Sequence, residues 1–231
     1  MKKITFKLVL LVILANTTCL CYGQTEKGIN GKNSFAPDFL KVMEAKVRMI
    51  DSSINSKLLE TLTADFERIA LAEKKQWLPY YYASLGHIKI GTMMAGGQNK
   101  TEIDQRAEKA ERLLNSAIEL SRESSETWCL KSMIATLRLI ADPMSRWQQY
   151  GQLSEEAINK AEQLNPNNPR VFVLRGEDKF YTPEEYGGNK KQAKEYLEKA
   201  IRLFEIFKPE SIIHPNWGKN QTYENLKQIK L

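Results

Sequence analysis

The sequence predicts an all-α fold of antiparallel helix hairpins that stack as repeats, and three observations lead to that prediction. Three short segments of similar pattern recur along the chain at nearly constant spacing. A stripe of small and apolar residues with the period of an α-helix follows each of them. Gly-Gly pairs stand in the connection within the first and third hairpins.

The chain opens with a basic, an apolar and a small-residue region in that order. Lys2, Lys3 and Lys7 surround the start of an apolar run that ends at Ala15, and short polar residues follow. This is the layout of a secretory signal peptide. We place the signal peptide at residues 1–23, and we expect an exported protein, periplasmic or secreted.

The apolar run is too short to cross a bilayer, which takes about 20 apolar residues. We therefore expect no transmembrane segment after cleavage. A lipid anchor at Cys19 or Cys21 is the alternative, but neither cysteine follows the leucine and small residues that such an anchor needs.

Charge argues against a nucleic-acid partner. The whole chain has 34 basic and 28 acidic residues and a net charge of +6. The leader holds three lysines and no acid, so the mature chain keeps 31 basic residues against 28 acidic ones and a net charge of +3. Nucleic-acid binding usually needs a clustered basic face.

Only one of the three cysteines, Cys129, lies beyond the leader. The mature chain therefore forms no intramolecular disulfide. Cys129 stands beside Trp128 in an apolar helical stretch, which favours a buried small hydrophobe over a reactive thiol.

Residues 24–34 are polar and glycine-containing, and we expect them to be disordered. We expect residues 35–76 to form a pair of helices that is a degenerate first repeat. Pro37 suits a first helical turn, and residues 51–55 form a turn with capping residues.

Three segments with an aromatic residue at the start and Gly or Ser four residues later carry the repeat. They are Tyr82–Gly86, Trp128–Ser132 and Phe172–Gly176, at spacings of 46 and 44 residues. The stripes that follow lie at residues 110–120, 154–164 and 193–203. Large aromatic residues need small residues opposite them where helices cross, and the structural repeat positions are Tyr82, Gly86, Ala117, Trp128, Ala161, Phe172, Gly176 and Ala200.

This pattern resembles the tetratricopeptide repeat (TPR) family over residues 77–208. The resemblance rests on the aromatic and small positions and on residues 164–176. Ala161 and Pro166 stand at the late alanine and closing proline of one repeat, and Phe172 and Gly176 open the next. It implies three repeats in a short right-handed solenoid. The family period is 34 residues, and here it is near 45, so the extra residues fall in the turns within each pair. Residues 209–231 would form a C-terminal capping segment, with Trp217 as its apolar plug.

The Gly-Gly turns look at first like phosphate-binding loops. They lie at residues 95–100 and 186–191, each with an amide residue and a lysine after the glycines. A phosphate loop follows a strand and has a different spacing. We therefore expect structural turns, in which Asn99 and Asn189 cap the next helices.

No catalytic or metal-ligating pattern is visible. The two histidines, His87 and His214, lie far apart in the sequence, and no zinc or calcium ligand set is present. We predict no enzyme, no catalytic residue, no metal and no cofactor.

In the TPR family, ligands lie along the concave face that the first helices of each pair form. The resemblance implies a concave binding face here, formed by Tyr80, His87, Glu126, Met133, Arg170, Glu177 and Tyr181. We accordingly expect a non-catalytic scaffold that binds a protein or peptide of unknown identity. The alternatives are a small-molecule binder or enzyme that uses a pocket near Trp147 and Tyr150, and a lipid-anchored accessory subunit.

Overall fold

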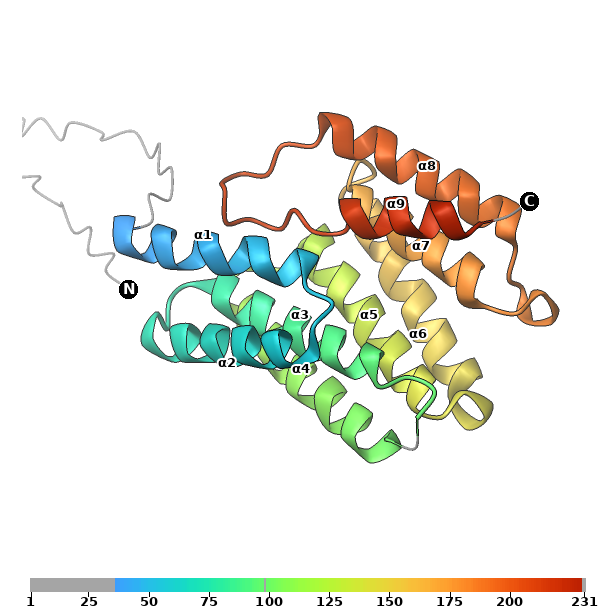
Figure 1. Cartoon of the computed structure of the whole chain (residues 1–231), viewed down its shortest axis with the longest axis horizontal. Helices are drawn as coiled ribbons and strands as arrows, with labels where there is room; N and C mark the ends of the chain where they lie inside the picture. The colour runs from blue at the N-terminus through green and yellow to red at the C-terminus, as the bar shows by residue number, and fades with distance from the viewer. Residues whose placement is uncertain (1–35, 98, 230–231) are drawn as a thin grey trace, which may run out of the picture. The chain divides into compact units, whose positions relative to one another are not determined.

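Helices dominate the described part of the chain (Figure 1), which a computed structural model gives for residues 36–97 and 99–229. No residue within these ranges lies in a β-strand, so the predicted all-α class is confirmed. The helices are α1 (Pro37–Ser52), α2 (Ser56–Ala72), α3 (Trp77–Met93), α4 (Lys100–Ser121), α5 (Ser125–Ala141), α6 (Pro143–Leu164), α7 (Pro169–Tyr181), the short 3-10 helix η1 (Glu184–Tyr186), α8 (Lys190–Ile206) and α9 (Lys219–Gln228).

The expected signal peptide (1–23) and the expected disordered stretch (24–34) lie outside the described residues. Within residues 36–229, no helix is both long enough and apolar enough to cross a membrane.

Local sequence signals explain where several helices begin. Pro37, Pro143 and Pro169 stand in first turns, where the missing N–H costs nothing. Asn189 Oδ1 accepts a hydrogen bond from the backbone N–H of Gln192 at 2.9 Å, as a capping residue does.

The first Gly-Gly turn is capped differently from the second. Asn99 occupies the position before α4, but its side chain makes no capping hydrogen bond there. In the second turn Gly187 has a φ of 96°, which only glycine adopts readily. A Cβ on Gly188 would overlap the carbonyl oxygen of Thr182, so this glycine lets two backbone segments meet.

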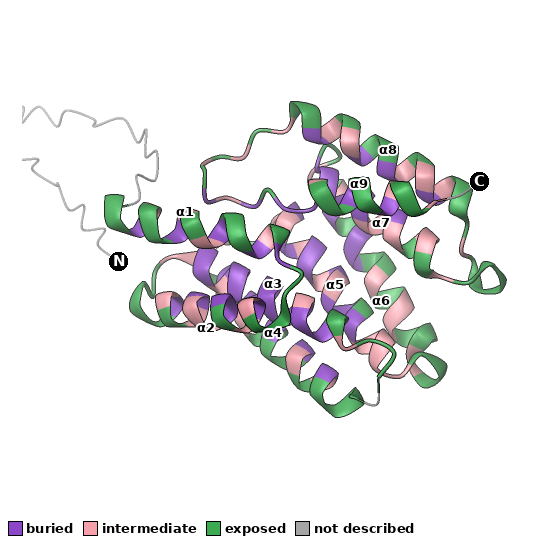
Figure 2. Cartoon of the chain, in the orientation of Figure 1, coloured by how far each residue is buried: buried purple, intermediate pink, exposed green. Residues whose placement is uncertain are grey.

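Helices α3, α5 and α7 pack side by side, and each also packs on the helix that follows it. Thus α3 contacts α4 and α5, α5 contacts α6 and α7, and α7 contacts α8. Helix α2 packs on α3, and α9 packs on α8. The buried residues concentrate in α3, α5 and α7, while α4, α6 and α8 are buried along one stripe only (Figure 2).

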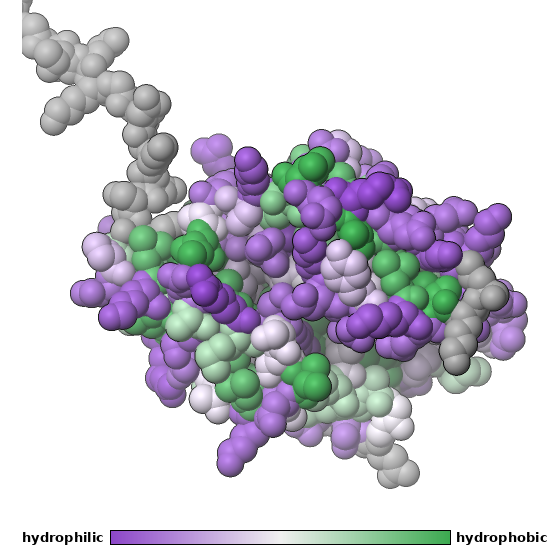
Figure 3. Space-filling view, turned by 45° about the horizontal axis from the view of Figure 1, so that its top comes forward, coloured by the Kyte–Doolittle hydropathy of each residue, from purple (hydrophilic) through white to green (hydrophobic). Residues whose placement is uncertain are grey.

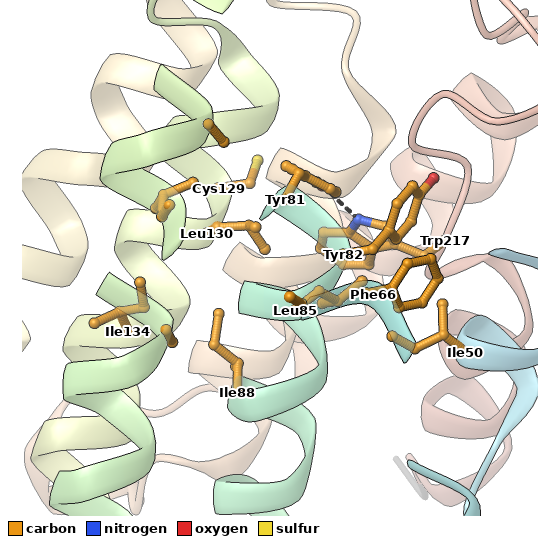
Figure 4. Close-up of a cluster of buried hydrophobic side chains, with 14 of the residues drawn as sticks. Ile50, Phe66, Tyr81, Tyr82, Leu85, Ile88, Cys129, Leu130, Ile134 and Trp217 are labelled. Carbon is orange, nitrogen blue, oxygen red and sulfur yellow. Dashed lines mark hydrogen bonds between the residues drawn. The ribbon is translucent and has the colours of Figure 1, made fainter. Parts of the chain in front are cut away.

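The core centres on aromatic residues of α2 and α3. The rings of Phe66 and Tyr82 stack with centroids 5.2 Å apart, and Tyr81 meets Tyr82 edge-on at 5.3 Å. Trp217 approaches this group from the C-terminal segment (Figure 4). Such aromatic pairs each add about 0.5–1.5 kcal/mol beyond the area that they bury.

The structural repeat positions are largely buried, but their partners differ from the expected aromatic-to-small pairing. Ala117, Ala161 and Ala200 are fully buried, as are Tyr82, Gly86, Phe172 and Gly176, whereas Trp128 is half-buried. The small residues admit non-aromatic neighbours instead. The side chain of Thr63 fills the space beside Gly86, and Leu197 Cγ lies 2.6 Å from where a Cβ of Gly176 would stand.

Candidate functional site

The chain's own C-terminal segment covers part of one face of the layer that α3, α5 and α7 form. The hydroxyl of Tyr82 donates to the carbonyl of Ile213 at 3.0 Å, and Trp217 Nε1 donates to the hydroxyl of Tyr81 at 2.7 Å. We call the covered side of this layer the inner face. Residues 213–217 therefore occupy part of it.

Two of the residues expected on the concave face, Glu126 and Arg170, meet under this cover. Arg170 Nε donates to Glu126 Oε2 at 2.7 Å, and Asn168 Nδ2 donates to Glu126 Oε1 at 2.9 Å. The Arg170 side chain is fully buried, and its guanidinium lies 4.5 Å from the ring centre of Phe207. This pair joins α5 to α7, and the Arg170 guanidinium also lies 5.8 Å from the ring centre of Trp217 in the C-terminal segment.

A second polar group lies farther along the inner face, and we call it the Glu177 cluster. It consists of Lys89 on α3, Glu177 and Tyr181 on α7, and Asn225 on α9. Asn225 Nδ2 donates to Glu177 Oε1 at 2.9 Å, and the Tyr181 hydroxyl donates to Asn225 Oδ1 at 3.3 Å. The Lys89 ammonium donates to the carbonyls of Ile50 and Asp51 at the end of α1.

The charges of this cluster are strongly affected by their surroundings. Burial raises the pKa of Glu177 to about 7, although the hydrogen bond from Asn225 and the nearby Lys89 oppose the rise. Burial lowers the pKa of Lys89, and the nearby carboxyl groups of Asp51 and Glu177 oppose that shift. Ionisable groups perturbed in this way gather at functional sites more often than elsewhere.

Apolar side chains of α5 lie on the same stripe of the layer. Met133 follows Glu126 by seven residues and Ile140 follows Met133 by seven, so all three share one face of α5. Both Met133 and Ile140 are half-buried and pack against the core. Figure 3 looks onto the side where α1 and α9 lie and shows a hollow near its middle, with polar and apolar side chains around it.

The other two residues expected on the concave face point elsewhere. His87 is buried between α2 and α4, with Nε2 2.6 Å from Glu67 Oε1 and Nδ1 3.3 Å from Arg106 Nη1. Burial lowers the pKa of His87. Tyr80 lies seven residues earlier, on the same side of α3. The structure thus brings Glu177 and Tyr181 together, and places Tyr80 and His87 away from the inner face.

The alternative pocket near Trp147 and Tyr150 divides into two separate features. The Trp147 ring lies 6.4 Å from the ring of Tyr186. Tyr150 instead lines a polar hollow with Arg138, Arg146 and Asp104. Arg146 and Asp104 form an ion pair there. Charged walls that already pair with one another make a poor site for an apolar ligand.

Metal-binding and thiol chemistry find no support in the described residues. No group of three or more histidine, cysteine or acidic side chains within them could hold a metal ion. Cys129 is fully buried, and burial raises the pKa of its thiol well above the usual range.

Two members of the Glu177 cluster were absent from the sequence-based set. Lys89 had one visible signal, because it is the single charged residue in the apolar stretch from Leu85 to Met93 apart from His87. No feature of the sequence pointed to Asn225, because its contacts with Glu177 and Tyr181 form only when α9 folds back onto α7.

Comparisons with known proteins identify one similar solved structure. The chain resembles the HusA haemophore from Porphyromonas gingivalis, with a TM-score of 0.72 and 34% sequence identity over 87% of this chain and 95% of that chain. No protein-family model matches the sequence, and no curated protein does.

This likeness corrects the expected function. A protein named as a haemophore carries a small molecule, so the expectation of a protein- or peptide-binding scaffold is wrong, and the small-molecule alternative is favoured.

Proposed function

The chain belongs to the family of the HusA haemophore, and from that premise we propose that it binds haem as cargo. The observation that carries the proposal is the extent of the likeness, because 34% identity over 95% of the haemophore leaves little room for a different architecture. We propose binding without chemical conversion of the haem.

We propose that the haem lies on the part of the inner face that residues 213–217 leave uncovered, between the Glu177 cluster and the half-buried Met133 and Ile140. Haem has a flat apolar macrocycle and two carboxylate groups, so it needs apolar surface beside a few polar partners. The ring of Tyr181, which is 62% exposed, offers a stacking surface at the edge of this region. Met133 offers a soft, adaptable contact.

The rival location is the aromatic pair of Trp147 and Tyr186. These rings are also exposed, at 52% and 62%. The pair lies on α6 and η1, whereas among the described residues Lys89 and Glu177, whose pKa values are shifted by burial, belong to the inner face. We therefore favour the inner face.

We also propose that the protein is exported and that its helices stack in the TPR manner. Export to the periplasm or beyond rests on the basic and apolar leader at residues 1–23. Stacking of the TPR type is supported by the pattern of helix contacts. Helix α5 packs against both α3 and α7, and each of these three helices packs on the helix that follows it in the sequence.

A titration with ferric haem tests the proposed function. The mature chain from Gln24 onward would be titrated and followed by haem absorbance and by quenching of its tryptophan fluorescence. We expect saturable binding near one equivalent. A chain that is helical by circular dichroism but shows no saturable change in either signal would refute the proposal.

A further inference from the structure

We propose that Lys89 and Glu177 together bind a carboxylate group of the cargo, with Glu177 acting as a neutral carboxyl group that donates a hydrogen bond. The inference rests on the proposed function, because haem carries two propionate carboxylates. It goes beyond that function by assigning the residues that recognise them.

Lys89 is a cation with an open donor. Its ammonium donates to the carbonyl of Ile50 at 2.7 Å and to that of Asp51 at 2.9 Å. An ammonium has three N–H groups, so one remains after these two bonds. The Asp51 carboxylate accepts a hydrogen bond from the backbone N–H of Gly218 at 3.0 Å. The carbonyl partners fix the ammonium in place, and the nearby Asp51 carboxylate favours its charged form.

Glu177 has one oxygen engaged and one open. Its Oε1 accepts the 2.9 Å hydrogen bond from Asn225, which fixes the direction of the carboxyl group. Among the described residues, the hydrogen bond found on the Glu177 carboxyl group is this one to Oε1, and none reaches Oε2. A neutral carboxyl group at this position can therefore donate its O–H from Oε2 to an incoming carboxylate.

The surrounding charges favour the neutral form when an anion binds. The ionisable groups that interact with Glu177 are Lys89 on α3 and Tyr181 on its own helix, while α9 contributes the neutral Asn225. Asp51 interacts electrostatically with Lys89. Burial already raises the Glu177 pKa to about 7. A bound carboxylate adds a negative charge and excludes water, and both effects raise that pKa further. Binding therefore takes up a proton near neutral pH.

The test compares ferric haem with its dimethyl ester, in which both propionates are esterified. Affinities would be measured for the full mature chain from about pH 5.5 to about pH 8.5. Haem affinity should be nearly constant below about pH 7 and fall by up to roughly tenfold for each pH unit above it. The ester should bind with an affinity that does not change across this range.

Variants assign the effect to the two residues. Glu177→Gln keeps an oxygen for Asn225 and should bind haem with no fall above about pH 7. Lys89→Met should weaken haem binding by roughly ten- to a hundredfold and leave ester binding unchanged. Glu195→Gln changes an exposed carboxylate of α8 and should keep the wild-type profile.

Each outcome decides one question. Equal, pH-independent affinity of the wild type for haem and its ester would overturn the inference while leaving the proposed function intact. A Glu177→Gln variant that keeps the wild-type fall in affinity would also overturn it. Failure of the wild type to bind either compound would refute the proposed function itself.

Discussion

Arg170 holds Glu126 through two parallel hydrogen bonds between α7 and α5, with Nε 2.7 Å from Oε2 and Nη2 2.5 Å from Oε1. The arginine side chain is fully buried, and the glutamate side chain is 17% exposed. Removing one partner of such a pair leaves the other charge desolvated without compensation.

Arg170→Met should therefore lower the free energy of unfolding by about 3–5 kcal/mol, measured by urea denaturation. The double variant with Glu126→Gln should recover part of that loss, because no uncompensated charge remains. Arg112→Met breaks an exposed pair with Glu108 and should change stability by less than about 1 kcal/mol. An equal loss in the Arg112 and Arg170 variants would contradict this reading.

Gly188→Ala should destabilise the fold by about 1–3 kcal/mol, because the new Cβ would overlap the carbonyl oxygen of Thr182. Gly151→Ala is the matched control within α6, where a Cβ would meet only Leu139 Cδ1 at 3.9 Å. That substitution should stabilise by about 0.5–1 kcal/mol. Thermal unfolding of the two variants should move in opposite directions, and a shift of the same sign would show that the turn relaxes freely.

Ala161→Leu should lower stability by about 1–3 kcal/mol, since Ala161 is fully buried and three extra carbons would overfill its surroundings. Lys160→Leu places the same side chain at the neighbouring exposed position and should have little effect. An unchanged melting temperature for Ala161→Leu would show that this position of α6 does not face the core.

The stability of the ligand-free protein should depend on Glu177. Its folded-state pKa of about 7 lies above the ordinary value of 4.5, so the folded state holds this proton more tightly than the unfolded state does. The resulting stabilisation is complete below about pH 4.5 and is lost as pH rises through about 7. Glu177→Gln should therefore be more stable than the wild type by about 1–3 kcal/mol at pH 8, and no more stable at pH 4. Urea titrations at the two pH values check this, and a variant less stable than the wild type at pH 8 would contradict it.

Tyr181 and Tyr186 form a matched pair for locating the cargo, because both are 62% exposed. Tyr181→Ala should weaken haem binding by roughly tenfold through loss of a stacking surface. Tyr186→Ala should leave the affinity within about twofold. The opposite ranking in a fluorescence titration would move the site to the Trp147 pair.

Helix positions follow from local sequence, which is why the all-α class was predictable. Pro37 and Asn189 mark helix starts through chemistry that acts within one turn, and the buried Ala117 and Ala161 lie on stripes with the helical period. These signals need no knowledge of distant residues.

The site depended on contacts between distant parts of the chain, and only part of it was predicted. Glu177 and Tyr181 were found because they lie on the expected face of one helix. His87 was included for the same reason, yet it turns toward Glu67 and Arg106 and is buried. Lys89 and Asn225 joined the cluster only because α1 and α9 fold against α3 and α7.

A crystal structure of the mature chain with haem would test the central claim most directly. The account predicts the macrocycle on the inner face beside Tyr181 and Met133, with a propionate within hydrogen-bonding distance of Lys89 and Glu177. A macrocycle bound between Trp147 and Tyr186, or at any place that leaves the Glu177 cluster unoccupied, would contradict it.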